Sequence, residues 1–312
     1  MLWDDALRLV LLLVPTACSA PMIPKELFRK IRRLEIRTKG MVDNIFGGEY
    51  HSAFKGRGIE FAEVRPYQIG DDIRTIDWNV SARMGETYVK VFEEEREQTL
   101  MLLVDISGSE DFGSQYKMKR DVAAEVCAVI AFSAIQNGDK VGLLLFTDTV
   151  ELFVPPKKGR RHELRLIRDL FAHEPSSRGT DLSNALRHTL HLLRQRSIAL
   201  IISDFFDAGY ERPLRVLAQR HDTVAVHLQD PREASLPNVG LVELTDAETG
   251  ETVVVDTRSA AARAAYAQAA ADRQRDTEQH LHQMQVGYIP MPTDADFVDP
   301  LVRFFRQRNR AT

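Results

Sequence analysis

The sequence predicts an α/β protein with a doubly wound, mostly parallel sheet and helices on both of its faces. The first observation is a series of short apolar runs, at residues 99–104, 141–146 and 198–202, which are typical of strands buried on both faces. The second is that stretches with helical periodicity separate and follow these runs, at residues 117–136, 161–171 and 181–194. Strand–helix alternation of this kind folds into a parallel sheet between two layers of helices, with right-handed crossovers.

Further elements extend this pattern toward the C-terminus. We expect an antiparallel edge strand at residues 150–154, because only three residues separate it from the preceding strand. A helix at residues 213–220 and a strand at 223–228 continue the alternation. Beyond them we expect a β-hairpin at 239–257 with its turn at 246–250, a long alanine-rich helix at 258–285, a strand at 286–291 and a closing helix at 297–308.

We divide the chain into four parts. Residues 1–21 are interpreted as an upstream extension or a mis-started segment, and residues 22–96 as a basic helix followed by a β-rich module. Residues 97–230 form the α/β domain, and residues 231–312 the C-terminal hairpin and helices. Little helical periodicity shows at residues 43–95, which are rich in glycine, aromatic and charged residues, so we expect strands and turns there.

The first 42 residues contain two patterns that can indicate membrane contact. For both we favour an interpretation without a membrane. Residues 7–20 are apolar, but Asp4 and Asp5 occupy the end at which a signal peptide is basic, and Pro15 interrupts the run. A secretory signal or anchor is therefore the alternative. The helix expected at residues 24–42 has one apolar stripe among basic residues, and we expect it to pack on its own domain rather than on a membrane.

Composition narrows the class of protein. The 312 residues are 44% hydrophobic and 28% charged, as in ordinary globular proteins. A formal net charge of -4 gives no support to nucleic-acid binding as the main activity. Cys18 and Cys127 are the only cysteines, so neither a disulfide framework nor a cysteine-rich zinc site can be built. This fits a reducing compartment, and we expect a cytoplasmic protein.

Hydroxyl and carboxylate residues follow two of the predicted strands and precede one helix. Asp105, Ser107 and Ser109 come directly after the strand at 99–104, and Asp204 comes after the strand at 198–202. Thr180 lies in the loop that enters the helix at 181–194. Ligands of doubly wound sheets bind at the carboxyl ends of the strands, so these three segments can converge. Hard oxygen ligands of this kind suit Mg²⁺ or Mn²⁺, and we expect one such ion.

Two other interpretations of these residues remain open. The serines and aspartates can simply cap helices and turns without binding an ion. Alternatively, Asp105 and Asp204 can belong to a metal-dependent phosphoesterase or nuclease. Two-metal catalysis needs additional bridging carboxylates. The candidates are Asp111, Asp181 and Asp207.

The combination of Asp105-x-Ser107-x-Ser109, a distant Thr180 and a distant Asp204 resembles the metal-ion-dependent adhesion site of von Willebrand factor type A domains. The resemblance implies a non-enzymatic domain that binds partner proteins. In that interpretation the ion keeps one coordination position for a carboxylate offered by the partner.

Several longer motifs resemble the signature of domain-of-unknown-function family 58, whose members fuse such a segment to a von Willebrand-type domain. These motifs are residues 47–58, 61–67, 70–79 and 82–83, together with Tyr288-Ile-Pro and Phe304-Phe305-Arg306. Genes of this family commonly neighbour a MoxR-type AAA+ ATPase, which implies an adaptor that works with that ATPase in maturing or remodelling a client protein. One departure is Glu110, because such proteins often carry an apolar residue there. We expect this added carboxylate to join the ion or lie beside its ligands.

Polar and aromatic residues crowd the segment from residue 63 to residue 83, which is a candidate partner-binding surface. The set comprises Glu63, Arg65, Tyr67, Asp71, Asp72, Asp77 and Trp78. The alternative is an internal network of salt bridges and turns that holds the β-rich module together.

Overall fold

The computed structural model describes residues 50, 59–94, 97–111, 113 and 117–311. The chain splits into two compact units, one comprising Met1–Ala53 with Thr99–Thr312 and the other Phe54–Gln98. The expected extension at 1–21, the basic helix at 24–42 and the motif at 47–58 lie outside the described residues, apart from Tyr50. Within the described part of the chain, no helix is both long enough and apolar enough to cross a membrane.

The larger unit is built on a six-stranded sheet with the order β10-β7-β6-β3-β4-β5. Its strands are β3 (Thr99–Asp105), β4 (Lys140–Phe146), β5 (Val150–Lys157), β6 (Ile198–Ser203), β7 (Asp222–Gln229) and β10 (Gly287–Pro292). All neighbouring strands are parallel except β4 and β5, which confirms the antiparallel edge strand. Counted along the chain, this order is 3-2-1-4-5-6, the order of a doubly wound sheet, and the predicted fold class is confirmed.

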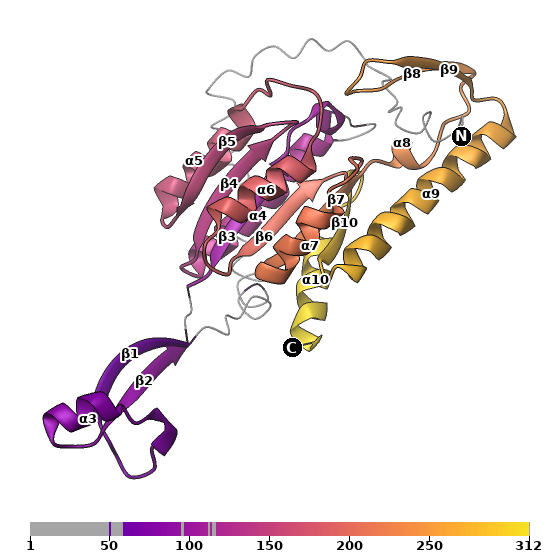
Figure 1. The fold of residues 1–312 in the computed structure, drawn as a ribbon. Helices are drawn as coiled ribbons and strands as arrows, with labels where there is room; N and C mark the ends of the chain where they lie inside the picture. Colours follow the sequence, from indigo (N-terminus) through magenta and orange to yellow (C-terminus); the bar gives the residue numbers. More distant parts are fainter. Residues whose placement is uncertain (1–49, 51–58, 95–96, 112, 114–116, 312) are drawn as a thin grey trace. The chain divides into compact units, whose positions relative to one another are not determined.

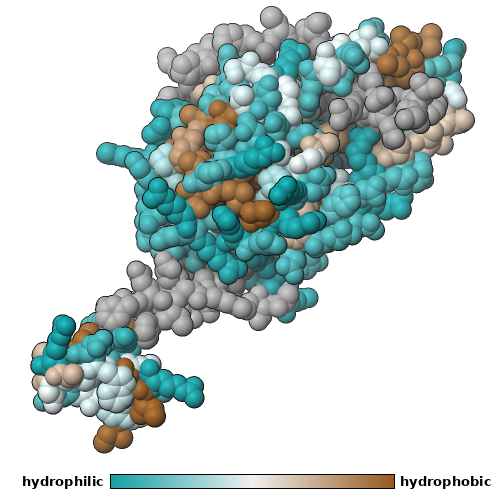
Figure 2. Space-filling model, viewed as in Figure 1, coloured by the Kyte–Doolittle hydropathy of each residue, from teal (hydrophilic) through white to brown (hydrophobic). Residues whose placement is uncertain are grey.

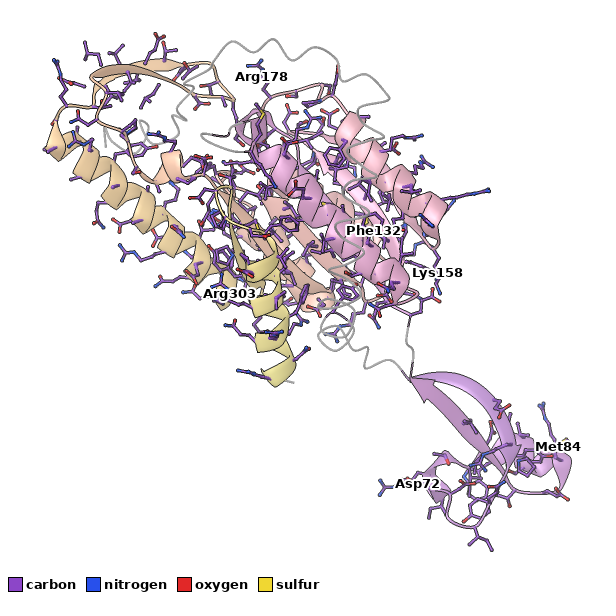
Figure 3. All side chains as sticks on the ribbon, turned by 180° about the vertical axis from the view of Figure 1, so that it is seen from behind. Asp72, Met84, Phe132, Lys158, Arg178 and Arg303 are labelled. Carbon is purple, nitrogen blue, oxygen red and sulfur yellow. The ribbon has the colours of Figure 1, made fainter. Side chains whose placement is uncertain are left out.

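Helices cover both faces of this sheet. Figure 1 shows α6 (Leu182–Leu192) and α7 (Glu211–Arg220) in front of it, and Figure 3, seen from behind, shows α4 (Lys119–Gln136) and α5 (Arg160–Ala172) on the other face. The pairs α4–α5 and α6–α7 each pack together. The C-terminal helices α9 (Ala260–Gln283) and α10 (Val298–Ala311) pack against β10. The single-turn helix α8 (Pro231–Ala234) follows β7 and packs on α9.

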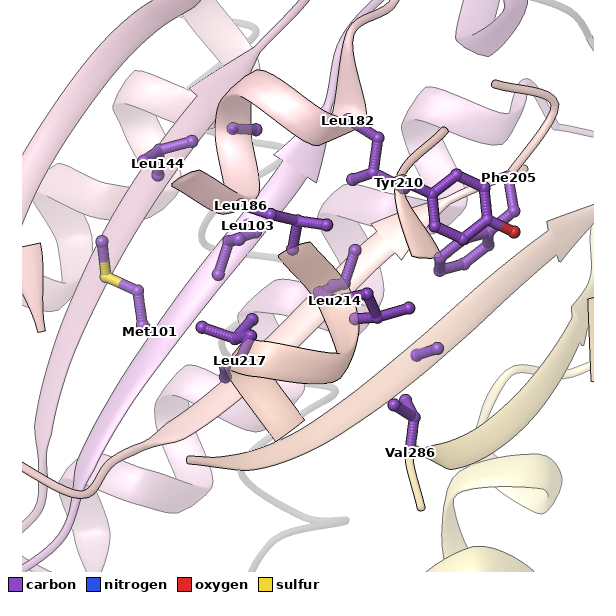
Figure 4. Close-up of a cluster of buried hydrophobic side chains, with 14 of the residues drawn as sticks. Met101, Leu103, Leu144, Leu182, Leu186, Phe205, Tyr210, Leu214, Leu217 and Val286 are labelled. Atoms are coloured by element: carbon purple, nitrogen blue, oxygen red, sulfur yellow. The ribbon is translucent and has the colours of Figure 1, made fainter. Parts of the chain in front are cut away.

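Apolar side chains of the central strands alternate between the two faces. On the α6–α7 face, Met101 and Leu103 of β3 belong to a buried cluster with Leu186 and Leu214 (Figure 4). The residues between them, such as Leu102, are equally buried, and the period of two along a strand turns them to the other face. Burial of both faces holds the ends of β3 and β6 rigidly, and these ends carry the candidate site.

The smaller unit contains one short helix that the sequence pattern did not predict. Strands β1 (Ile59–Pro66) and β2 (Tyr88–Glu94) pair antiparallel, as expected of a β-rich segment. Between them lie the 3₁₀ turn η3 (Ile73–Thr75) and the helix α3 (Trp78–Met84). Seven residues are too few for helical periodicity to show, and the helix is set by its ends. The Asp77 carboxylate accepts bonds from the first amides, and Gly85 ends the helix at φ 75°.

The C-terminal hairpin is also present. Strands β8 (Leu241–Thr245) and β9 (Thr252–Asp256) pair with each other and, among the described strands, form a sheet separate from the main one. The expected turn at 246–250 joins them, and Gly250 adopts a φ of 73° that favours glycine.

We expect Leu144→Ala to lower the free energy of unfolding by about 2–5 kcal/mol, because it leaves a cavity in the packed α6–α7 face. The matched control is Leu241→Ala, whose side chain is 66% exposed and loses little packing. Urea denaturation of both variants measures the difference. Equal losses of stability would show that the cluster is not the rigid core described above.

Candidate metal centre

The candidate site lies between the two central strands. β3 ends at Asp105, and its parallel neighbour β6 ends at Ser203, one residue before Asp204. The chain reaches β4 on one side of β3 and β6 on the other, so the strand order reverses at this point. Such a switch point opens a crevice at the carboxyl ends of the strands, which is where doubly wound proteins bind their ligands.

Hydrogen bonds tie the predicted residues of these two loops together. Asp105 accepts bonds at one oxygen from the Ser107 amide (2.9 Å) and at the other from the Ser203 hydroxyl (2.8 Å). The Ser107 and Ser109 hydroxyls lie 3.1 Å apart, and the Ser109 side chain bonds to Asp204. All of these side chains are buried. Four of the five residues in the predicted metal set therefore converge.

Thr180, the fifth residue, reaches the same end of the sheet by a different contact. Its loop is joined to the Asp105–Ser109 loop by a backbone bond from the Gly108 amide to the Arg178 carbonyl (2.9 Å). Figure 3 shows Arg178 at this end of the sheet. The Thr180 hydroxyl donates to the carboxylate of Glu248 (2.8 Å), in the turn of the β8–β9 hairpin. Sequence reasoning did not find Glu248.

The sequence suggested a site with many hydroxyls and only two carboxylates. The structure adds further charged side chains to it. Glu110 lies buried in the 3₁₀ turn η4 (Gly108–Asp111), which also contains Ser109. One oxygen each of Asp105, Glu110 and Asp204 lie within 4.8 Å of one another. Lys119, the first residue of α4, is fully buried and donates to Asp204 (2.9 Å). Its ammonium also pairs with Glu233 of α8.

Of these additions, only Glu110 carried a signal in the sequence, because it directly follows the Asp-x-Ser-x-Ser motif. Glu233 closes a capping box with Asp230, and Lys119 is the first residue of α4. Neither side chain could be assigned to the site without knowing how α4 and α8 pack.

The buried charges shift one another's proton affinities. Burial, followed by the nearby Asp204, raises the pKa of Asp105 to about 7. Burial also raises the pKa of Glu233 to about 7 and that of Glu110 well above its ordinary value. Burial alone would raise the pKa of Asp204, but the Lys119 ammonium outweighs it and the pKa is lowered. The site thus has four carboxyl groups and one ammonium.

This arrangement fits a divalent cation. Within the described part of the chain, neither carboxylate oxygen of Glu110 has a hydrogen-bond partner, although the side chain is fully buried. An unsatisfied buried carboxyl is costly, and either a proton or a cation can relieve it. The carboxylates of Asp105, Glu110 and Asp204, with the hydroxyls of Ser107 and Ser109, are the hard oxygen ligands that Mg²⁺ and Mn²⁺ prefer.

A cavity of about 220 Å³ adjoins the acids. Asp204 and Glu233 lie at its inner side, and Phe206, Pro231 and Ala234 supply apolar wall. A side chain from outside could therefore lie beside Asp204 without rearrangement of the sheet.

The proposed partner-binding set in the smaller unit divides into two kinds of residue. Arg65 donates to both oxygens of Asp71 (2.8 and 2.7 Å), while Asp72 caps η3 and Asp77 caps α3 and lies 3.5 Å from Lys90. These charges form the internal network that was the alternative interpretation. Trp78 is 71% exposed, Tyr67 and Glu63 are also exposed, and Ile69 and Ile73 beside them are exposed as well. Figure 2 shows hydrophobic residues on the surface of this unit.

We expect Lys119→Met to lower the free energy of unfolding by about 3–5 kcal/mol, because it leaves Asp204 and Glu233 buried without their counter-charge. The control is Lys117→Met, which removes a half-exposed pair with Glu125 and should cost about 1 kcal/mol or less. Chemical denaturation without divalent ions measures both. A Lys119→Met protein as stable as the control would contradict this charge balance.

We expect the apparent affinity for Mn²⁺ to rise between about pH 5 and pH 8, because the ion competes with protons on the site. The pKa of Asp105 is raised to about 7, so the carboxyl holds a proton below that pH and must lose it to bind a cation. Titration calorimetry in buffers of different ionisation enthalpy measures affinity and proton release together. Constant affinity across this range, without proton release, would show that the ion does not bind Asp105.

Comparison with known proteins agrees with the resemblance to domain-of-unknown-function family 58. The chain is 34% identical over 299 residues to the uncharacterized protein Rv1480 of Mycobacterium tuberculosis, which covers 95% of this chain and 94% of that protein. The structure of the conserved hypothetical protein BatB from Bacteroides thetaiotaomicron aligns with 68% of this chain and 99% of its own, at a TM-score of 0.47 and 13% identity. The SpRpn10 VWA domain aligns with 65% of this chain and 93% of its own, at a TM-score of 0.40 and 12% identity. The family described as "protein of unknown function DUF58" matches residues 63–276, and the chain belongs to that family.

Proposed function

We propose that this protein is a non-enzymatic, divalent-cation-dependent protein-binding module. In this proposal it works in the cytoplasm as an adaptor for a MoxR-type AAA+ ATPase that matures or remodels a client protein. The observation that supports the cation most directly is the buried Glu110 carboxyl, which lies among Asp105 and Asp204 and has no hydrogen-bond partner among the described residues. The position of the group at the switch point of the sheet supports a ligand-binding role.

One Mg²⁺ or Mn²⁺ ion would be held by Asp105, Ser107, Ser109, Thr180 and Asp204. Glu110 would join them or lie beside them. The three charges of Asp105, Asp204 and Glu233 would balance the ion together with Lys119, and Glu110 adds a further buried carboxyl beside them. A charge-neutral, poorly hydrated site of this kind can accept a carboxylate from a partner, because the ion–carboxylate bond is strong where water is excluded.

The aromatic residues of the smaller unit offer a second surface, which we propose as a second partner-binding site. Trp78 and Tyr67 are exposed. Arg65 and Asp71 pair with each other, and Asp72 and Asp77 cap η3 and α3. Exposed aromatic side chains held on a rigid scaffold are typical of protein-binding surfaces. The ion pairs of Arg65 and Asp71 would then shape this surface rather than contact the partner.

The number of carboxyl groups also bears on the alternative, a phosphoesterase or nuclease that uses Asp105 and Asp204. Glu110 and Glu233 bring the site closer to a carboxylate-rich metal centre than the sequence suggested. Two of the additional acids considered earlier are engaged elsewhere, because Asp181 and Asp207 both accept amide bonds at the start of α6. The side chain of Asp111 lies outside those described.

Lys119 also holds the space between Asp204 and Glu233, where a second cation would be repelled. Magnesium-dependent hydrolysis abolished by Asp204→Asn would establish this alternative.

We expect EDTA and Asp105→Ala each to reduce capture of the neighbouring AAA+ ATPase, or of its client, at least tenfold in a pull-down with the full chain. Loss of one metal-bound partner contact commonly costs this much, since a tenfold change corresponds to about 1.4 kcal/mol. The matched control is Asp169→Ala, whose carboxylate pairs with Arg165 and Arg168 on α5, away from the proposed metal ligands. Capture that survives both treatments would contradict the proposal.

Titration with Mg²⁺ and Mn²⁺ separates this proposal from a purely structural role. A folded wild-type protein that gives no heat at millimolar ion would show that Lys119 and protons alone neutralise the acids.

A further inference from the structure

The turn of the β8–β9 hairpin is locked into one conformation by its own hydrogen bonds. The Asp246 carboxylate accepts bonds from the amides of Glu248 (2.8 Å) and Thr249 (3.0 Å). The Asp246 backbone closes the turn by bonds with Gly250 and Glu251. Asp246 and Ala247 are buried although they lie at the tip of a hairpin. The turn is therefore covered by something, and the Glu248 side chain has a defined direction.

The cover is the candidate metal centre itself. A Cβ atom on Gly108 would lie 2.6 Å from the Ala247 carbonyl oxygen and 3.3 Å from the Arg178 Cβ atom. Only glycine between Ser107 and Ser109 leaves room for the hairpin tip at this distance. In Figure 1 the hairpin lies at the end of the sheet where the parallel strands terminate. The tip thus packs directly on the loop that carries the serine ligands.

Glu248 places a carboxyl group beside the candidate metal centre. Its carboxylate accepts a hydrogen bond from the hydroxyl of Thr180 (2.8 Å), and Thr180 is one of the predicted metal ligands. Glu251, at the other end of the same turn, is exposed.

We propose that Glu248 is a built-in ligand that takes the coordination position left for a partner's acid. This inference rests on the proposed function, because it assigns an occupant to the open position of the same cation. A partner then binds by displacing the hairpin, so that its own aspartate or glutamate replaces Glu248. The partner therefore presents an acidic side chain on its surface. This side chain must compete with Glu248 for the ion, and the stability of the hairpin contact determines how strongly.

Few apolar contacts hold the hairpin in place, which allows it to move. It pairs with no strand of the main sheet, and its apolar contact is a small cluster of Leu236 and Leu244 with Val255 and Tyr266. Its outer residues Leu241 and Val254 are largely exposed. Figure 2 shows a hydrophobic area over the hairpin. A two-stranded hairpin is marginally stable by itself, and weakly packed segments open at a small fraction of the free energy of global unfolding.

The test is chemical rescue of Mn²⁺ binding by acetate, measured by titration calorimetry on the full chain. Acetate is a free carboxylate that can fill a vacated position but cannot displace a tethered one. We expect Glu248→Ala to weaken Mn²⁺ binding about tenfold, as loss of one metal-coordinating group typically does. Tens of millimolar acetate should restore most of that loss in Glu248→Ala. Acetate should leave the wild type and the control Glu251→Ala unchanged.

The outcomes separate this inference from the function on which it rests. If the wild type binds Mn²⁺ while Glu248→Ala binds it equally well, the inference is overturned and the cation site stands. An equal gain from acetate in the wild type and in Glu248→Ala would also overturn it, because the position would then be open already. If the wild type binds no Mn²⁺, the cation site and the built-in ligand fail together.

Amide hydrogen exchange gives a second measurement that needs no added carboxylate. With Mn²⁺ bound, residues 241–256 should exchange faster in Glu248→Ala than in Glu251→Ala, because only Glu248 ties the hairpin to the ion. Equal exchange in the two variants would show that the hairpin is held by packing alone.

Discussion

The balance of buried charge at the ends of β3 and β6 is the constraint on which the site depends. Four carboxyl groups lie out of water, and the ammonium of Lys119 directly pairs with only Asp204 and Glu233. Buried charges are tolerated only when they are paired, protonated or bound to a cation. Asp105 and Glu110 therefore hold protons more tightly than free carboxyl groups do, and the same excess of acid gives the site its capacity for a divalent ion.

The sheet makes this concentration of charge possible. Parallel strands packed on both faces end at one edge, so loops from β3, β6 and the start of α6 meet there although they are far apart in the sequence. The packed core beneath them fixes the strand ends. The loops can then hold polar groups at defined positions, such as the Ser203 hydroxyl on Asp105, without contributing to the core themselves.

Two additions distinguish this chain from a bare α/β domain. The β8–β9 hairpin places Ala247 on the serine loop and Glu248 on Thr180, so an internal acid already lies at the site where an external one is proposed to bind. The unit from Phe54 to Gln98 uses its charges internally and leaves Trp78 exposed. The proposed adaptor role uses both features. The cation centre under the weakly packed β8–β9 hairpin would bind one protein, and the exposed aromatic residues would bind another.

The sequence by itself determined the α/β fold class, the alternation of its strands and helices, and the placement of Asp105, Ser107, Ser109 and Asp204 at strand ends. These follow from local periodicity and from the rule that parallel strands share one carboxyl edge. It missed the helix at Trp78–Met84, which is too short for periodicity and depends on its caps. Only the tertiary structure decided that Lys119, Glu233 and Glu248 join the site. Each comes from a different element, and the distance between their charges depends on how α4, α8 and the hairpin pack, which no local pattern records.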